Sequence, residues 1–289
     1  MSAPVMIGMR LPDIDVWSER VVVALGQNPG VFTGPGTNTY LIGTGSRRIL
    51  LDTGEGRPEY LDVLERACVR AGVTGLQEIV LTHGHPDHMG GLAGVLERFG
   101  PLRVSKLGWP GNDEAYDCEL TQIGEGSVLR TQGATLRALH APGHAQDHLC
   151  FMLEEEGALF SGDNVLGVGT TVIPAQGGDL LDYLHSLERL LAQAPRTIYP
   201  AHGPRIADGV AKLREYIAHR RERETQILAA LDQGLALIPE MVRRIYAGYP
   251  EALYPAAAMS VASHLRKLEH EGLVTRKGDD LLSARWSRP

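Results

Sequence analysis

The sequence predicts an α/β domain over residues 1–207, followed over residues 208–289 by a helical, winged-helix-like module. In the first part, short apolar runs alternate with amphipathic helical patterns, as in folds that layer helices against sheets. Several of these runs end in His or Asp, and open α/β sheets bind ligands at their strand ends. Beyond Asp208 helical periodicity dominates, until a turn-rich segment near the end indicates a hairpin.

The composition is that of an ordinary globular protein. Of 289 residues, 43% are hydrophobic and 22% are charged, which allows a substantial buried core. The net charge of −7 argues against a surface that coats nucleic acid, although the residues from Asp208 onward carry a balance of +2. Cys68, Cys118 and Cys150 are scattered and odd in number, so they predict neither a disulfide framework nor a thiolate metal site.

The start of the chain, Met1 to Asp13, has no basic stretch followed by an apolar core, so no secretory signal is predicted. Apolar runs also stay shorter than the roughly 20 residues that a membrane-spanning helix needs. We therefore expect a cytoplasmic protein in a reducing compartment, without a membrane partner.

Apolar runs and turn residues define the elements of the first hundred residues. Val21–Leu25 reads as a strand, whereas residues 26–38 are rich in Gly, Pro, Asn and Thr and predict a loop. Gly43–Ser46 separates two further strands as a hairpin, and Gly72 ends a helical pattern. These criteria place strands at 21–25, 40–42, 48–51 and 78–81, and helices at 58–70 and 92–99.

The same criteria apply to the rest of the chain, where a polar, Gly-rich loop is expected over residues 167–178. Strands are predicted at 102–104, 127–129, 135–139, 149–153, 158–161 and 197–200, and helices at 180–191, 208–231, 238–246 and 259–270. The final hairpin is expected to pair residues 272–275 with 281–285 around the turn at 277–280.

The segment Thr82–His88 carries the strongest chemical signal. It reads Thr-His-Gly-His-Pro-Asp-His and lies between a predicted strand and a predicted helix. His83, His85, Asp87 and His88 offer four ligand-type side chains within six residues, and imidazole and carboxylate are the usual protein ligands of zinc besides thiolate. Because Asp87 and His88 diverge from the first two histidines, more than one metal is expected.

Three further ligand-type residues, His144, Asp163 and His202, follow the ends of apolar strands in the same way. A single catalytic zinc takes about three protein ligands, so seven candidates suit two metals that share one carboxylate. Two such cations lower the pKa of a bridging water and polarise the substrate. Asp52, at a strand end, is the first candidate to fix the tautomer of a ligating imidazole. The histidines at 140, 185, 219, 264 and 270 lack such a context and are expected to have no role at the site.

The turn, with Asp52-Thr53-Gly54 before it and the three later ligand residues after it, resembles the metallo-β-lactamase fold superfamily over roughly residues 18–207. The resemblance implies an αββα sandwich with a dinuclear site at one edge. It also implies a first metal on His83, His85 and His144, a second on Asp87, His88 and His202, and Asp163 as the bridge. Asp87 and Asp163 are then the residues expected to act in catalysis.

A narrower resemblance rests on Gly36–Tyr40, on Gly169–Val172 and on His202-Gly203-Pro204 with the charged helix that follows. These segments are similar to the beta-lactamase-like branch with a C-terminal winged-helix domain, whose animal member is a mitochondrial endoribonuclease acting on single-stranded RNA. Supporting or substrate-contacting roles are therefore expected for Asp52, Asn38, His148, Thr170 and Thr171.

The favoured function is a dinuclear zinc hydrolase that uses a metal-bridging hydroxide to cleave phosphodiesters in single-stranded RNA, with Mn²⁺ or Fe²⁺ as other metals. The basic residues Arg266, Lys267, Arg276 and Lys277 are expected to contact the RNA backbone from the second helix and the wing. The alternative is a thioester or lactone hydrolase of the glyoxalase II type. A third hypothesis is a nucleic-acid-binding regulator with a vestigial metal site.

Overall fold

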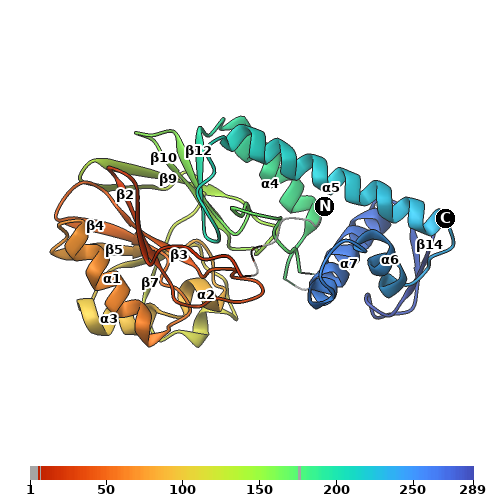
Figure 1. The fold of residues 1–289 in the computed structure, drawn as a ribbon, viewed down its shortest axis with the longest axis horizontal. Helices are drawn as coiled ribbons and strands as arrows, with labels where there is room; N and C mark the ends of the chain where they lie inside the picture. The colour runs from red at the N-terminus through yellow and green to blue at the C-terminus, as the bar shows by residue number, and fades with distance from the viewer. Residues whose placement is uncertain (1–5, 7, 175–176) are drawn as a thin grey trace.

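The computed structural model describes residue 6 and residues 8–174 and 177–289. Part of the N-terminal segment for which no secretory signal is predicted, residues 1–5 and 7, lies outside the described residues, as do residues 175–176 of the predicted loop. Two β-sheets stack face to face with helices on both outer sides, and a helical module follows (Figure 1). The predicted αββα sandwich with a C-terminal winged-helix-like domain is thereby confirmed.

The strands and helices come in the following order along the chain. The first sheet and its helices comprise β1 Ile14–Ser18, β2 Val21–Leu25, β3 Asn38–Ile42, β4 Arg47–Leu51, α1 Pro58–Arg70, β5 Gly75–Val80, α2 Pro86–Met89, α3 Leu92–Phe99, β6 Val104–Lys106, the 3₁₀ turn η1 Asp113–Ala115 and β7 Leu120–Gln122. The second sheet and its helices comprise β8 Val128–Thr131, β9 Ala134–His140, β10 Leu149–Leu153, β11 Ala158–Gly162, α4 Leu180–Ala192, β12 Thr197–Pro200 and α5 Gly209–Asp232. The C-terminal part comprises α6 Ile238–Ile245, the 3₁₀ turn η2 Glu251–Leu253, α7 Tyr254–His270, β13 Thr275–Lys277 and β14 Arg285–Ser287.

The first sheet has the order β1-β2-β3-β4-β5-β6-β7, and the second has the order β12-β11-β10-β9-β8. In the first sheet β1 to β4 pair antiparallel, and the pairs from β4 to β7 are parallel. In the second sheet the pair β11 and β12 is parallel, so two strands that precede ligand-type residues point the same way.

Strand β2 explains why the apolar runs are continuous rather than alternating. Val21 and Val23 face the core between the sheets, whereas Val22 and Ala24 face the helix layer of α1 and α3. A strand that is buried on both faces needs apolar side chains at every position. The inter-sheet core also contains Phe160 and other large side chains of the second sheet.

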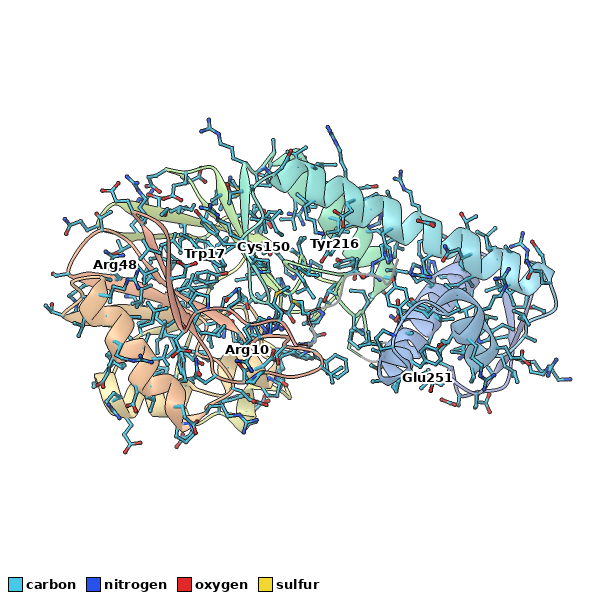
Figure 2. The ribbon with its side chains drawn as sticks, in the orientation of Figure 1. Arg10, Trp17, Arg48, Cys150, Tyr216 and Glu251 are labelled. Carbon is cyan, nitrogen blue, oxygen red and sulfur yellow. The ribbon has the colours of Figure 1, made fainter. Side chains whose placement is uncertain are left out.

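Helix α5 links the sandwich to the C-terminal module (Figure 1). Its first half contributes Leu213, Tyr216 and Ile217 to the core formed with α4 and the second sheet, and Tyr216 lies beneath the helix beside α4 (Figure 2). Its second half contributes Ile227 and Leu231 to the core formed with α6, α7, β13 and β14. The division of the chain at 207 and 208 stays a prediction, and α5 belongs to both cores.

Several element bounds differ from those predicted. Strands β1 and β7 and the short helix α2 were missed, because β1 and β7 have partly exposed side chains and depend on pairing with a neighbour. The strand expected at 102–104 lies at Val104–Lys106. Helix α7 begins at Tyr254 rather than 259, since Pro255 is tolerated in its first turn.

The final hairpin also differs from the prediction. Its strands are β13 and β14, with a longer connection than expected. The backbone N–H of Ala284 bonds to Asp280, so residues predicted as the start of the second strand form the turn instead. Trp286 on β14 is buried, and its backbone N–H donates to Ala236, which attaches the hairpin to the helices. Among the described residues, no helix is both long and apolar enough to cross a membrane.

Candidate metal centre

The seven ligand-type residues lie at one edge of the sandwich, each just beyond a strand. His83 and His85 follow β5, and the four-residue helix α2 turns Asp87 and His88 back toward them. Pro86 occupies the first turn of α2, where a missing N–H has no cost. The later three, His144, Asp163 and His202, follow β9, β11 and β12.

His83, His85 and His144 form the first group, with one ring nitrogen of each within 4.8 Å of the others. Nδ1 of His85 lies 2.9 Å from Nε2 of His83 and 3.0 Å from Nε2 of His144. Two nitrogens bound to one tetrahedral zinc are separated by about 3.4 Å. The three imidazoles therefore converge on a point in the manner of a metal site.

Asp87, His88, Asp163 and His202 form the second group, also within 4.8 Å of one another. Oδ1 of Asp163 lies 3.1 Å from Nε2 of His202 and 3.3 Å from Nε2 of His88. The other oxygen of Asp163, Oδ2, lies 3.4 Å from Nε2 of His144 in the first group. One carboxylate thus presents an oxygen to each group.

Opposite electrostatics distinguish the two groups. Burial lowers the pKa of His85 to about 4 and lowers the pKa of His83 and His144 as well, so these rings are neutral at pH 7. Burial alone would lower the pKa of His202 too, but the Asp163 and Asp87 carboxylates raise it to about 9. The same carboxylates, with Asp52, raise the pKa of His88.

The donor set fits divalent cations. Nε2 of His88 and Oδ1 of Asp163 are buried and lie 3.3 Å apart, but neither makes a contact with hydrogen-bond geometry. Buried polar atoms are normally satisfied, because an unpaired one costs about 1–3 kcal/mol. A cation in each group would satisfy them, and imidazole with carboxylate suits zinc, iron or manganese.

Comparisons with known proteins agree with this geometry. Residues 32–202 match the model of the Metallo-beta-lactamase superfamily, and residues 238–286 match the Beta-lactamase associated winged helix domain. The chain belongs to the metallo-beta-lactamase superfamily. The predicted resemblance and the prediction of a hydrolase are both confirmed.

Fungal relatives and a solved bacterial structure cover most of the chain. Lactamase-like protein adaB of Aspergillus niger is 38% identical over 93% of this chain and 86% of its own. Atrochrysone carboxyl ACP thioesterase of Claviceps purpurea is 40% identical over 82% of this chain and 75% of its own. A metallo-beta-lactamase family protein from Thermus thermophilus is 26% identical, with a TM-score of 0.72 over 100% of this chain and 98% of its own.

Two of the ligand-type imidazoles, His88 and His144, have an acceptor behind the ring. Asp52 Oδ2 lies 2.8 Å from Nδ1 of His88 and also accepts a 2.9 Å hydrogen bond from the Thr82 hydroxyl. Asp52 adopts a φ of +60°, an uncommon conformation for a non-glycine residue, at the end of β4. The backbone carbonyl of Val172 lies 2.9 Å from Nδ1 of His144. Such partners fix ring orientation and tautomer.

The other predicted supporting residues have different positions. Asn38 donates hydrogen bonds of 2.9 Å to the carbonyls of Pro200 and Gly203, so it holds the turn that carries His202. His148 accepts a 3.1 Å hydrogen bond from the backbone N–H of Asp163 and lies behind that carboxylate. Thr171 lies 3.3 Å from Nδ1 of His144, whereas Thr170 lines the adjacent cavity.

Two sets of supporting residues were missed by the sequence analysis. Lys106, fully buried at the end of β6, pairs with Asp147 at 2.6 Å and with Asp113 at 2.8 Å. This triad packs beneath the turn of His83 and His85, where Gly84 accepts a 3.0 Å hydrogen bond from Asn112. The acidic residue between His144 and His148 was a signal for Asp147, but no local signal marked Lys106.

The second missed set comes from the C-terminal helices. Arg220 of α5 is buried and donates a 2.6 Å hydrogen bond to the carbonyl of Thr171. Ser263 of α7 donates a 2.7 Å bond to the carbonyl of Ile173. Because Thr171 and Val172 contact His144, helices α5 and α7 hold the segment that orients this candidate ligand.

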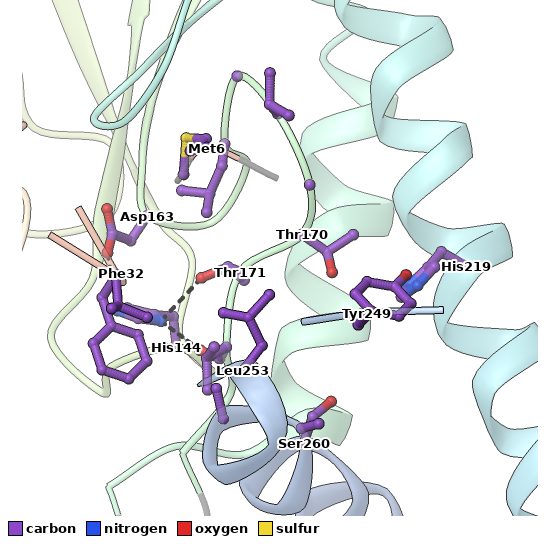
Figure 3. Close-up of a pocket in the computed structure, with 18 of the residues that line it drawn as sticks. Met6, Phe32, His144, Asp163, Thr170, Thr171, His219, Tyr249, Leu253 and Ser260 are labelled. Atoms are coloured by element: carbon purple, nitrogen blue, oxygen red, sulfur yellow. Dashed lines mark hydrogen bonds and ion pairs between the residues drawn. The ribbon is translucent and has the colours of Figure 1, made fainter. Parts of the chain in front are cut away.

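A cavity of about 560 Å³ lies between the two groups of candidate ligands and the C-terminal helices (Figure 3). His144 and Asp163 line one end of it, and Figure 3 shows His219 and Tyr249 on the opposite side. The loop after β11 supplies residues 166–172, among them Leu166, Val168 and Val172, and the N-terminal region contributes Met6, Val31 and Phe32. His219, which was expected to have no role at the site, is thus part of the cavity wall.

The basic residues expected to contact RNA are mostly engaged within the chain. Lys267 lies 2.8 Å from both Glu224 and Glu271. Arg266 donates to the carbonyl of Gly178 and lies 3.4 Å from Asp179. The third, Arg276, lies 3.4 Å from Glu269. These contacts tie α7 and the hairpin to neighbouring elements, whereas Lys277 is exposed.

Proposed function

We propose that this chain is a dinuclear metal-dependent thioesterase. The observation that carries the proposal is the predominantly apolar cavity that begins at His144 and Asp163. An apolar cavity suits the acyl part of a thioester and would desolvate a phosphodiester backbone at high cost. The relatives named atrochrysone carboxyl ACP thioesterase support the same choice. The thioester alternative is therefore preferred over the RNA endonuclease that the sequence favoured.

The candidate ligand groups give the residues their proposed roles. His83, His85 and His144 would hold one cation, Asp87, His88 and His202 the other, and Asp163 would bridge them through its two oxygens. Two divalent cations bound there would lower the pKa of water and polarise the thioester carbonyl. Zinc is our first choice, with Mn²⁺ and Fe²⁺ as the alternatives.

The chain's own groups complete the reaction. A water oxygen adds to the thioester carbonyl carbon, the C–S bond breaks, and the proton lost by the water ends on the departing thiolate. Asp87 has 23% of its side chain exposed against 11% for Asp163, so it is the site carboxylate with the greater access to solvent. We assign Asp87 to the transfer of this proton, and the cavity to orienting the acyl group.

A parallel assay of metal-loaded protein tests this proposal. The substrates are a thioester of N-acetylcysteamine, S-lactoylglutathione, an acyl-homoserine lactone, single-stranded RNA and bis-p-nitrophenyl phosphate. We expect the highest kcat/KM on a thioester. Cleavage of RNA or of the phosphodiester without thioester hydrolysis would overturn the proposal. A preference for the lactone would overturn it in favour of a lactone hydrolase.

A further inference from the structure

We infer that the cavity between the sandwich and the C-terminal helices is an acyl-binding site selective for bulky, apolar, ring-sized acyl groups. The inference rests on the proposed thioesterase function and adds the substrate class and the part of the chain that sets it. The C-terminal module would then form the side of the active site that determines which acyl groups are accepted.

The size of the cavity argues against a small acyl group. Its volume of about 560 Å³ falls in the range of roughly 300–1,000 Å³ typical of sites that enclose drug-sized ligands. A lactoyl or acetyl group has only a few heavy atoms and would leave most of this apolar space unfilled. A ring system attached to the thioester carbonyl would fill it and bury its apolar surface.

The width of the cavity depends on small residues of one face of α7. Ala256, Ala257 and Ser260 line it, at the spacing of positions that share a helix face, and Leu253 lines it from η2 just before the helix. Ala256 is 9% exposed, and it is absent from the apolar core of the C-terminal module, whereas Ala257 belongs to that core. The methyl group of Ala256 therefore limits the cavity rather than filling the core behind it.

Aromatic side chains supply further walls. Tyr246 and Tyr249 reach the cavity from the segment between α6 and α7. The guanidinium of Arg223 lies 4.1 Å from the centre of the Tyr246 ring, which holds that ring in place. Phe32 lines the cavity from the N-terminal region although 59% of it is exposed. Flat aromatic faces favour a planar partner over a flexible chain.

A series of three thioesters of N-acetylcysteamine tests the inference: acetyl, phenylacetyl and 2-naphthylacetyl. The methylene group keeps the carbonyl chemistry similar along the series. For the wild type we expect kcat/KM to rise at least about tenfold from acetyl to 2-naphthylacetyl. Ala256→Phe should reverse this order, and Leu253→Ala, which enlarges the cavity, should keep it. Ala229→Phe, on an exposed part of α5 outside the cavity lining, is the matched control.

A binding measurement separates this inference from the proposed function. The probe is the 2-naphthylacetyl ketone analogue in which a methylene replaces the thioester sulfur, titrated by calorimetry. Tight binding by the wild type and by Ala229→Phe, weakened at least about tenfold in Ala256→Phe, supports the acyl site even if no thioester is cleaved. Equal binding by all three folded, metal-loaded proteins, or equal kcat/KM along the thioester series, would overturn it while leaving thioester hydrolysis itself intact.

Discussion

The guanidinium of Arg220 donates a 2.6 Å hydrogen bond to the backbone carbonyl of Thr171, which lies 49 residues earlier in the chain. Thr171 and its neighbour Val172 both contact Nδ1 of His144. Arg220 also lies over the ring of Tyr183, whose hydroxyl donates to the carbonyl of Asn164, next to Asp163. One buried arginine of the C-terminal part thus acts behind two candidate metal ligands.

Arg220→Met should therefore weaken metal binding without removing any ligand. Groups that orient a ligating side chain typically change metal affinity or activity by about 10–100-fold when they are lost. The measurement is competition with a chelator of known affinity, together with kcat and KM. Arg221→Met, whose side chain is exposed and pairs with Glu188 at the surface, is the control. Unchanged metal affinity in Arg220→Met would mean that the segment holds His144 without this bond.

Asp163→Ala should reduce the metal content below two ions per chain and lower kcat/KM by at least about 10³-fold. The carboxylate presents one oxygen to each ligand group, so its loss affects both. Metal ions stabilise the charge of a transition state by several kcal/mol, and a loss of about 4 kcal/mol corresponds to a 10³-fold decrease in rate. Elemental analysis checks the metal content and circular dichroism checks the fold, with Asp182→Ala at an exposed position of α4 as the control. Two ions retained by Asp163→Ala would disprove the bridging role.

Metal binding at the second group should release protons at pH 7. The raised pKa values of His88 and His202, the latter about 9, mean that at this pH both rings are protonated on both nitrogens and positively charged in the metal-free protein. A ligating imidazole must be neutral, so affinity at this group should rise as the pH increases toward about 9. His85, with a pKa of about 4, is already neutral at pH 7 and has no additional proton to release.

Calorimetry in buffers of different ionisation enthalpy measures this release. At pH 7 we expect close to two protons to be released when an ion binds to the second group, and far fewer when an ion binds to the first group. The release should decline above pH 9, where the His202 ring is neutral without metal. A heat that does not depend on the buffer at pH 7 would contradict the charge state assigned to the second group.

Lys267→Ala should lower stability rather than RNA affinity. The side chain bridges Glu224 on α5 and Glu271 just after the last turn of α7, and its removal leaves the largely buried Glu224 without this partner. We expect a loss of about 1–3 kcal/mol in the free energy of unfolding. Lys277→Ala, on the exposed hairpin, is the comparison and should be close to neutral.

The RNA hypothesis is tested with the same variants across a salt series. A phosphate-binding surface would lose affinity steeply as salt rises, with a shallower slope after removal of basic residues. For single-stranded RNA we expect no steep loss of affinity with salt, and the same slope for the wild type, Lys267→Ala and Lys277→Ala. A slope that falls in Lys277→Ala would restore the hairpin as a nucleic-acid contact.

The sequence was most informative where chemistry follows directly from local pattern. His83, His85, Asp87 and His88 form one short motif, and each later ligand-type residue follows an apolar strand, so strand direction alone gathers them. Arg220 and Lys106 carry no such pattern. Their roles depend on contacts with Thr171 and Asp147, which lie 49 and 41 positions away in the chain, and such pairings are set by tertiary packing.

The cavity was beyond the sequence for the same reason. Its walls come from the loop after β11, from α5 and from α7, and only their packing creates the space. The basic residues near the C-terminus illustrate the opposite error. Their composition resembled a nucleic-acid contact, but within the fold Lys267 pairs with Glu224 and Glu271, and Arg276 pairs with Glu269. The composition gives the number of charges, whereas the tertiary packing decides which of them are paired.

Helix α5 has a mechanical consequence for how a substrate reaches the metals. Its 24 residues span about 36 Å, and no Gly or Pro interrupts it after Gly209. Because one unbroken rod is anchored in both cores, the module cannot swing away as a hinged lid without breaking helical hydrogen bonds or exposing a core. Val31 and Phe32, which are 50% and 59% exposed, line the same cavity from a loop that belongs to neither core, so this part of the wall can adjust to a substrate without disturbing the helix.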